Sequence, residues 1–320
     1  MTILTTLSVS DVDAMLQPYG LRQQHIAPTL GGVENTNYLV TAEDANGSHA
    51  LVLTLIESAP SNSHWFLPAV LDRLQAAGLP TPQLRRTLSG ATAVMWSERR
   101  VLLCSRIAGE HRTQVSAEDC AAIGRFLARQ HRAMDDLRSA LPPHPRQAVW
   151  LHEHVDALAL HIPPWQQALL VDALAQTDSL FARADYQALP EAVVHGDLFR
   201  DNALFTAQGL SGVIDFHHAA VHKRVFDIAV TINDWCDDTT LGLSAARMQA
   251  LLRAYNGITP LTVTELSLLP ALLSYAALAF SLSRLHGHVA RPDNYGKSPL
   301  PMLYRLSQRT APPWPRICIA

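Results

Sequence analysis

The sequence has few of the features that define secreted, membrane or nucleic-acid-binding proteins. Only four of its 320 residues are cysteines, and they lie far apart without paired spacing, which suits neither a disulfide framework nor a zinc cluster. Charged residues make up 17% of the chain and the formal net charge is −3, so there is no basic field to attract nucleic acid or an anionic membrane. We therefore expect a cytoplasmic protein with reduced thiols and with neither nucleic acid nor membrane as a partner.

Long apolar runs are also missing. The most apolar stretch, Leu266–Phe280, is interrupted by a proline and by serines, and it is shorter than the ~20 residues that a bilayer requires. The first residues show no basic segment followed by an apolar run, which a secretion signal would need. Ser10 and Asp11 look instead like a helix cap. The stretch at 266–280 therefore predicts a buried helix.

The first hundred residues have the pattern of a small antiparallel sheet with one helix. Short β-prone runs are separated by turn residues, among them Asn46-Gly47, a pair that favours hairpins. One stretch beginning at Ser63 has helical apolar spacing and is stopped by Gly78 and Pro80. The strands are expected at residues 25–30, 38–41, 51–55, 93–96 and 101–104.

After residue 105 the pattern changes to long helices. Strand patterns return only at residues 192–194 and 213–214 before helices resume. This organisation predicts an α+β protein of two lobes: a nucleotide-binding lobe at 1–104, and a larger, mainly helical lobe at 105–320 that carries the catalytic loop and the acceptor site. A length of 320 residues with 48% hydrophobic content is sufficient for two domains.

The strand-rich insert of the second lobe contains the residues that suggest chemistry. His195-Gly196-Asp197 is followed by Asn202, and Asp215 comes 13 residues after Asn202. Phosphoryl transfer requires a carboxylate that accepts the proton of a hydroxyl, and metal ions that neutralise phosphate charge. Asp197 can serve as that base, while the amide oxygen of Asn202 and the carboxylate of Asp215 are hard ligands of the kind that suit Mg²⁺. A simple turn at residues 201–202 would leave the joint spacing unexplained.

The pattern His-Gly-Asp-x-x-x-x-Asn followed by Ile-Asp-Phe resembles the aminoglycoside-phosphotransferase branch of the protein-kinase-like fold. The resemblance implies ATP and Mg²⁺ as cofactors, Asp197 as the catalytic base, and Asn202 and Asp215 as metal ligands. It also implies that Asp227 is a structural carboxylate that holds the catalytic loop.

More of the chain is similar to the branch that contains the bacterial homoserine kinases. This resemblance implies an ATP-dependent kinase that phosphorylates the hydroxyl of L-homoserine, a step of threonine biosynthesis. A kinase for another small alcohol, such as an amino alcohol, a thiosugar or an aminoglycoside, is the alternative, and a non-catalytic nucleotide-binding module is a second one. The segments that carry the resemblance are residues 31–38, 52–55, 227–236 and 282–285.

The nucleotide is expected between the first two strands and the linker that joins the lobes. A Gly-Gly turn lets backbone approach a triphosphate closely, the polar residues after it offer donors, and linker backbone groups can bond adenine. The expected residues are Gly31, Gly32, Asn35, Thr36, Asn37, Ser105 and Ile107.

One residue of the site differs from related kinases, and two candidate residues for binding the acceptor have a second possible role. Thr54 stands where most kinases of this fold carry a lysine or arginine that holds the phosphates, and Arg200 is a candidate substitute. Homoserine is zwitterionic, so its site should offer oxygens to the ammonium and a cation to the carboxylate. Asp234 and Arg284 meet these needs, although either could equally form a structural ion pair.

Overall fold

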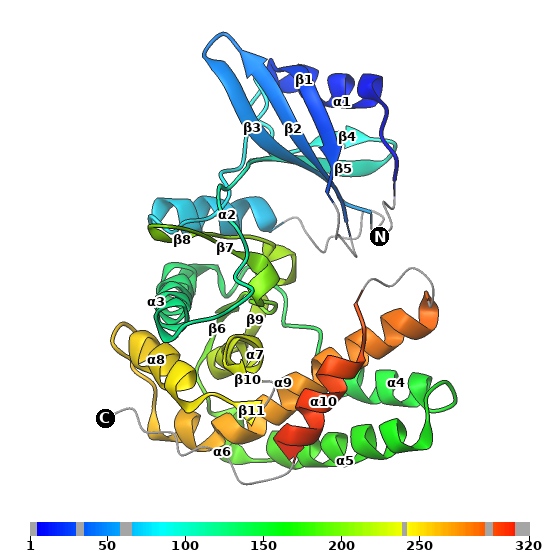
Figure 1. Cartoon of the computed structure of the whole chain (residues 1–320), viewed down its shortest axis with the longest axis vertical. Helices are drawn as coiled ribbons and strands as arrows, with labels where there is room; N and C mark the ends of the chain where they lie inside the picture. The colour runs from blue at the N-terminus through cyan, green and yellow to red at the C-terminus, as the bar shows by residue number, and fades with distance from the viewer. Residues whose placement is uncertain (1–4, 30–34, 58–65, 239–241, 292–296, 311–320) are drawn as a thin grey trace. The chain divides into compact units, whose positions relative to one another are not determined.

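A computed structural model describes residues 5–29, 35–57, 66–238, 242–291 and 297–310 (Figure 1). Its described residues form two units, and the chain passes from one to the other between Ala108 and Gly109. The sequence pattern places the change of character a few residues earlier, at 105. Each unit has strands and helices of its own.

The smaller unit contains a five-stranded antiparallel sheet with the strand order β1-β2-β3-β5-β4 (Figure 1). Each strand overlaps one of the five predicted runs, and a hairpin joins β2 to β3 at the expected place. Its turn residues are Ala45 and Asn46, and Gly47, with a φ of 123°, is the first residue of β3. The expected helix is present as α2, and a second helix, α1, precedes the sheet. The bounds are α1 Val9–Leu16, β1 Arg22–Pro28, β2 Thr36–Asp44, β3 Gly47–Leu55, α2 Leu67–Ala76, β4 Val94–Trp96 and β5 Arg99–Ser105.

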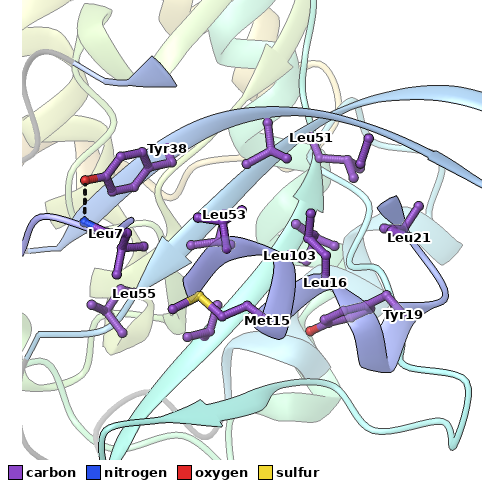
Figure 2. Packing of buried hydrophobic residues seen from close by; sticks show 14 residues of the cluster. Leu7, Met15, Leu16, Tyr19, Leu21, Tyr38, Leu51, Leu53, Leu55 and Leu103 are labelled. Carbon is purple, nitrogen blue, oxygen red and sulfur yellow. Dashed lines mark hydrogen bonds between the residues drawn. The ribbon is translucent and has the colours of Figure 1, made fainter. Parts of the chain in front are cut away.

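The hydrophobic core of this unit lies between α1 and one face of the sheet. Alternate residues of β3, among them Leu53, are buried and face Met15 and Leu16 of α1 (Figure 2). The helix begins with a capping box in which Ser8 and Asp11 bond each other's backbone N–H, so the cap is Ser8 and not Ser10 as the sequence suggested. The apolar spacing placed the helix correctly, but either of two neighbouring serines, Ser8 and Ser10, could have capped it.

The larger unit is mainly helical, as predicted. Short strands pair in three antiparallel ladders, β6 with β9, β7 with β8, and β10 with β11 (Figure 1). The helices are α3 Ala117–Ala133, α4 Ala148–Leu158, α5 Pro164–Phe181, α6 Ala184–Gln187, α7 Arg224–Trp235, α8 Ala245–Asn256, α9 Val263–Ala290 and α10 Leu300–Thr310. The strands are β6 Glu191–Val194, β7 Ala203–Thr206, β8 Gly209–Val213, β9 Ala220–Lys223, β10 Asp237–Asp238 and β11 Gly242–Leu243.

Helix α9 contains the apolar stretch that the sequence predicted to be a buried helix. It is long and apolar enough to cross a membrane, but 72% of its apolar window is buried, and it packs against α4, α5, α7 and α10. Its first turn is closed by a capping box between Thr262 and Glu265. The buried Glu265 carboxylate also accepts two hydrogen bonds from Arg224, at 2.6 and 2.7 Å, which join α9 to the start of α7.

The β6–β9 and β7–β8 ladders place the candidate site. The loop that contains Asp197 leaves the end of β6 and enters β7 through a short 3-10 turn at Arg200–Asn202. Asp215 follows β8 by two residues. Because β7 and β8 are hydrogen-bonded neighbours, the end of the loop and the end of β8 lie at the same edge of this hairpin.

Candidate active site

Gly196 allows the loop after β6 to make a tight turn. Its φ is +76°, a conformation that residues with a side chain rarely adopt. A Cβ at this position would also lie 3.0 Å from the His218 carbonyl oxygen and 3.0 Å from Nε2 of His144. The turn and its packing therefore both require glycine immediately before Asp197.

A buried carboxylate, Asp227 of α7, holds this turn. One oxygen accepts the His195 backbone N–H at 2.7 Å and the other accepts the Gly196 N–H at 2.9 Å. The ring of His131 lies 3.0 Å from the first oxygen and its other nitrogen lies 2.8 Å from the hydroxyl of Tyr255. Burial would raise the pKa of Asp227, but these hydrogen bonds and the neighbouring histidines keep it below its usual value. Asp227 is therefore an ionised, fully bonded anchor for the loop.

Asn202 is bound directly to Asp197. Its amide nitrogen donates to the Asp197 backbone oxygen at 2.8 Å and to the carboxylate Oδ2 at 3.1 Å. These two bonds use the nitrogen, so the amide oxygen is the atom with which Asn202 would coordinate a cation. The loop thus brings a carboxylate and an amide, five residues apart, into direct contact.

Asp215 is fixed to the same loop through its neighbour. The Ile214 N–H donates to the Asn202 carbonyl at 2.9 Å, and the Ile214 carbonyl lies 3.0 Å from Nε2 of His195. Asp215 itself has a left-handed backbone with a φ of 66°, which is uncommon for a residue with a side chain.

The two aspartates differ in their tendency to ionise. Burial raises the pKa of Asp197 to about 8, and the nearby Asp215 adds to the effect, while Arg146 and Lys297 oppose it. Burial acts in the same direction on Asp215, but His217, His218 and His195 outweigh it and lower its pKa. Asp215 is therefore the anionic member of the pair, and Asp197 is a carboxyl with high proton affinity, which is the property expected of a base.

The donor set of the site suits a hard divalent ion. Asn202 offers an amide oxygen and Asp215 a carboxylate, both in the geometry set by the loop. Within the part of the chain that the structure describes, no group of three or more His, Cys, Asp or Glu side chains forms a metal site. A magnesium ion would thus take its other ligands from water and nucleotide phosphates, as Mg²⁺ commonly does.

The structure shows several of the residues expected at the nucleotide, all in the smaller unit. The hydroxyl of Thr54 donates to Oδ1 of Asn37 at 2.6 Å, and Oδ1 of Asn35 accepts the Glu57 N–H at 3.3 Å. Thr36 is hydrogen-bonded to Glu57. Gly31 and Gly32 lie outside the described residues.

The linker residues expected near adenine are placed at the end of β5. The N–H of Ser105 donates to the Gln83 carbonyl, and its hydroxyl accepts the Gln83 N–H, both at 2.9 Å. Ile107 is half-buried two residues later. Ser105 thus helps to hold the neighbouring segment in place.

Asp234 has partners that the sequence did not reveal. Its Oδ2 accepts the backbone N–H of Arg200 at 2.8 Å and Nε of the same residue at 3.2 Å, while Arg305 donates to Oδ1 at 3.2 Å. Of the two roles left open for Asp234, this arrangement favours the structural ion pair. The charge of Arg200 is therefore compensated by Asp234. This pairing disfavours Arg200 as the substitute for the lysine or arginine that most kinases carry at the position of Thr54.

Arg284 and two further cations lie around the catalytic loop. The guanidinium of Arg284 lies 6.0 Å from the ring centre of Phe199. Lys297 forms an ion pair of 2.7 Å with Asp201, and Arg146 donates to the Gly196 carbonyl at 3.4 Å. Sequence reasoning missed Arg146 and Lys297, because neither belongs to a motif and both reach the loop through tertiary packing.

Comparison with known proteins defines the class. A model of the phosphotransferase enzyme family matches residues 25–261, which include every residue of the loop and Asp215. The chain therefore belongs to this phosphotransferase family. The curated proteins that it matches over most of its length include several homoserine kinases. It is 38% identical to the homoserine kinase of Pseudomonas aeruginosa, over 89% of this chain and 88% of that protein, and 33% identical to that of Ralstonia nicotianae, over 89% and 87%.

Solved structures establish the fold. The spectinomycin phosphotransferase complex with ADP and its antibiotic superposes with a TM-score of 0.70 at 13% identity, covering 96% of each chain. An amicoumacin kinase bound to AMP-PNP and Ca²⁺ superposes with a TM-score of 0.68 at 17% identity, covering 92% of this chain and 90% of that one. The chain has the fold of these small-molecule kinases, the protein-kinase-like fold expected from the sequence.

Proposed function

We propose that this protein transfers the γ-phosphoryl group of ATP to the hydroxyl of L-homoserine, and so acts in threonine biosynthesis in the cytoplasm. One observation carries the proposal: the loop holds Asp197, Asn202 and the strand end before Asp215 together by direct hydrogen bonds. The similarity to homoserine kinases along nearly the whole chain supports the choice of acceptor.

In this proposal Asp197 accepts the proton of the acceptor hydroxyl as the oxygen attacks the γ-phosphorus. Asn202 and Asp215 hold Mg²⁺, which neutralises the charge of the phosphates when it is bound. Asp227 keeps the loop in position because it fixes the backbone immediately before Asp197.

The smaller unit is proposed to bind the nucleotide and the larger one the acceptor. Backbone and side chains of Gly31, Gly32 and residues 35–37 would contact the phosphates, and backbone groups at Ser105 and Ile107 would contact adenine. Arg284 is kept as a contact for the acceptor, because it lies against Phe199 within the catalytic loop. Asp234 remains a candidate for the ammonium only if it releases one of its two arginines.

The test is a comparison of acceptors at fixed MgATP. A site with buried groups for an α-ammonium and an α-carboxylate leaves them unpaired when an acceptor lacks one, and such losses commonly reach ~10²-fold or more. We expect kcat/KM for L-homoserine to exceed that for choline or an aminoglycoside by at least that factor. L-Serine, whose hydroxyl is one methylene closer to the charged groups, should also be poor. A preference for choline, an aminoglycoside or a thiosugar would contradict homoserine as the acceptor, and ATP turnover without dependence on any alcohol would contradict the kinase.

A further inference from the structure

Two buried arginines of α10 bind side chains at the end of α7. Arg305 and Arg309 are one helical turn apart, so they lie on the same face of α10, and only 7% and 3% of their surfaces are exposed. Arginine is rarely buried to this extent unless it is paired. Helix α10 also lies beyond residues 25–261, the part of the chain that the family model matches, so membership of the family does not account for its contacts.

The two arginines share one carboxylate and differ in their other partner. Nε of Arg305 donates to Oδ2 of Asp237 at 2.9 Å, and its Nη2 donates to Oδ1 of Asp234 at 3.2 Å. Arg309 donates to Oδ1 of Asp237 at 3.5 Å and to Oδ1 of Asn233 at 3.0 Å. Of these two arginines, Arg305 is therefore the one that connects α10 to Asp234.

Asp234 in turn caps the 3-10 turn of the catalytic loop. This turn begins at Arg200 and ends at Asn202, and the residue before it, Phe199, provides no side-chain cap. The first N–H groups of a helical turn lack partners within the turn, and a carboxylate that accepts one of them stabilises it. Oδ2 of Asp234 accepts the Arg200 N–H at 2.8 Å. Asp234 thus holds the backbone that places Asn202 against Asp197.

The other oxygen of the same carboxylate depends on Arg305. Oδ1 of Asp234 accepts Nη2 of Arg305 at 3.2 Å and, at a longer distance of 3.4 Å, Nη2 of Arg200. The terminal torsion of an aspartate is broad, so bonds on both oxygens are needed to keep the carboxylate in one orientation. Because Asp234 is buried, water cannot readily replace a missing partner. Loss of Arg305 should therefore allow the carboxylate to turn away from the Arg200 N–H.

A second contact joins the same C-terminal segment to the loop. Lys297, three residues before α10, forms an ion pair of 2.7 Å with Asp201, the residue between Arg200 and Asn202. The side chains of this pair are 37% and 51% exposed, and ion pairs with such exposure contribute little to stability. The buried connection through Arg305 is therefore the stronger of the two.

We propose that Arg305 is a positioning residue of the catalytic loop: it orients the carboxylate of Asp234, which caps the turn that holds Asn202 at the metal site. This inference rests on the proposed function, because it takes Asn202 as a ligand of Mg²⁺. Arg305 acts through Asp234 and contacts neither substrate. In this role the Asp234 carboxylate is committed to the loop and is not used by the acceptor.

The experiment measures how the reaction depends on Mg²⁺ in Arg305→Met, a variant that keeps a long side chain without charge. Loss of a residue that orients a metal ligand commonly costs ~10–100-fold in metal affinity or activity. Because Arg305 acts through a further residue, we expect kcat to fall about 10-fold and the Mg²⁺ concentration for half-maximal rate to rise about 10-fold. KM for L-homoserine should change less than ~3-fold.

Arg305→Lys provides a second variant that keeps the positive charge. A lysine can still pair with one carboxylate, but it lacks the fixed set of donors with which arginine binds two. Its kcat and its Mg²⁺ dependence should therefore lie between those of wild type and Arg305→Met. If circular dichroism shows that Arg305→Met does not fold, Arg305→Lys must still show the change in Mg²⁺ dependence.

Arg309→Met is the matched control. It removes a buried arginine from the same face of α10, and this arginine also bonds Asp237. Thermal unfolding should show a loss in Tm similar to that of Arg305→Met, because each variant removes one partner of a buried carboxylate. Its kcat and its Mg²⁺ dependence should stay within ~2-fold of wild type, because the cap on the loop is intact.

A double variant tests whether Arg305 acts through Asp234. Asp234→Asn alone should lower kcat and weaken the response to Mg²⁺, because an amide cannot accept from both arginines. Adding Arg305→Met should then cause less than a ~2-fold further loss, since the residue through which it acts is already altered. Losses that multiply in the double variant would mean that the two residues act independently, and would overturn the proposal.

Two further outcomes would overturn it. Arg305→Met and Arg309→Met with the same kcat and the same Mg²⁺ dependence would reduce Arg305 to a residue that only stabilises the fold. A raised KM for L-homoserine with unchanged Mg²⁺ dependence would mean that Asp234 serves the acceptor instead of the loop. The proposed function fails separately, if wild type does not phosphorylate L-homoserine. The same Mg²⁺ comparison can then be made with whichever alcohol wild type accepts, so the two failures are distinguishable.

Discussion

The catalytic loop and the strand ends of the smaller unit are both proposed to contact the substrates, yet different interactions hold them. In the loop, ionised Asp227 is completely buried and accepts two backbone N–H groups before Asp197. Where the start of β2 pairs with the end of β3, Thr54 and Asn37 form a neutral hydrogen bond of 2.6 Å. The larger unit thus positions charged groups around the proposed base, while the Thr54–Asn37 pair of the smaller unit is neutral. Substitutions in the loop should therefore have larger effects than those at Thr54.

The largest effect is expected from Asp197→Asn. The amide keeps the size of the side chain but cannot accept a proton, and loss of a general base commonly costs ~10²-fold or more in kcat. Affinity for MgATP should stay close to that of wild type, because the base faces the acceptor. Steady-state kinetics and calorimetry with MgATP test this together. A variant that retains more than about half of the turnover would show that Asp197 is not the base.

Asp227→Asn should follow. The amide has one acceptor oxygen where the carboxylate has two, so one backbone N–H of residues 195–196 loses its partner. We expect kcat to fall ~10–100-fold and the free energy of unfolding to fall by about 3 kcal/mol. The control is Asp178→Asn, because Asp178 also lies 3.0 Å from a histidine, His152, but at the surface. Equal effects of the two variants on unfolding would remove Asp227 from its role as the anchor.

Asp215→Ala should act on nucleotide binding. Without this carboxylate the proposed Mg²⁺ ion, which neutralises the phosphates, loses an anionic ligand. Affinity for ATP in the presence of Mg²⁺ should therefore drop roughly 10-fold or more. The same measurement without Mg²⁺ should show a much smaller difference. If calorimetry with Mg²⁺ gives the same affinity for variant and wild type, Asp215 does not bind the metal.

The stability of the nucleotide-free protein should depend on pH through Asp197. Its pKa in the folded protein, about 8, is above the ordinary value of 3.8, so the folded state holds this proton more tightly than the unfolded state. The contribution is favourable below the ordinary pKa and is lost as the pH rises through 8. Relative to wild type, Asp197→Asn should gain in Tm as the pH rises from about 4 to about 8, and the difference should then level off. A difference in Tm that is constant with pH would contradict the raised pKa.

The smallest effect is expected from Thr54→Val. Valine has the shape of threonine but cannot donate to Asn37, and the loss of one neutral hydrogen bond costs about 1 kcal/mol of stability. KM for ATP should change less than ~3-fold, because a neutral contact contributes little to phosphate binding. A much larger rise in KM would show that Thr54 itself supports the phosphates, and it would remove the contrast between the two regions.

The sequence predicts the local parts of this structure well. The five strands of the smaller unit and the buried helix at 266–280 follow from periodicity and turn residues, because these signals lie within a few residues. Asp197, Asn202 and Asp215 could be named together for the same reason, since one loop and one strand end contain them. Their roles in catalysis stay predictions.

Partners that come from distant segments could not be predicted. Asp234 bonds Arg305, 71 residues away, and Arg146 bonds Gly196, 50 residues away. No pattern along the chain indicates either contact, since helix packing determines which charges meet. Because Asp234 is already bonded to Arg305, it is not simply available to the acceptor. Arg146 is a cation beside the loop that belongs to no motif.

The most direct test of the central claim is to identify the product that the purified protein makes from MgATP and L-homoserine. Phosphorus NMR distinguishes a phosphomonoester of homoserine from inorganic phosphate. We predict that O-phospho-L-homoserine and ADP form in equal amounts, and that Asp197→Asn forms neither at a comparable rate. Release of inorganic phosphate alone, or an unchanged homoserine hydroxyl after ATP has been consumed, would contradict the account.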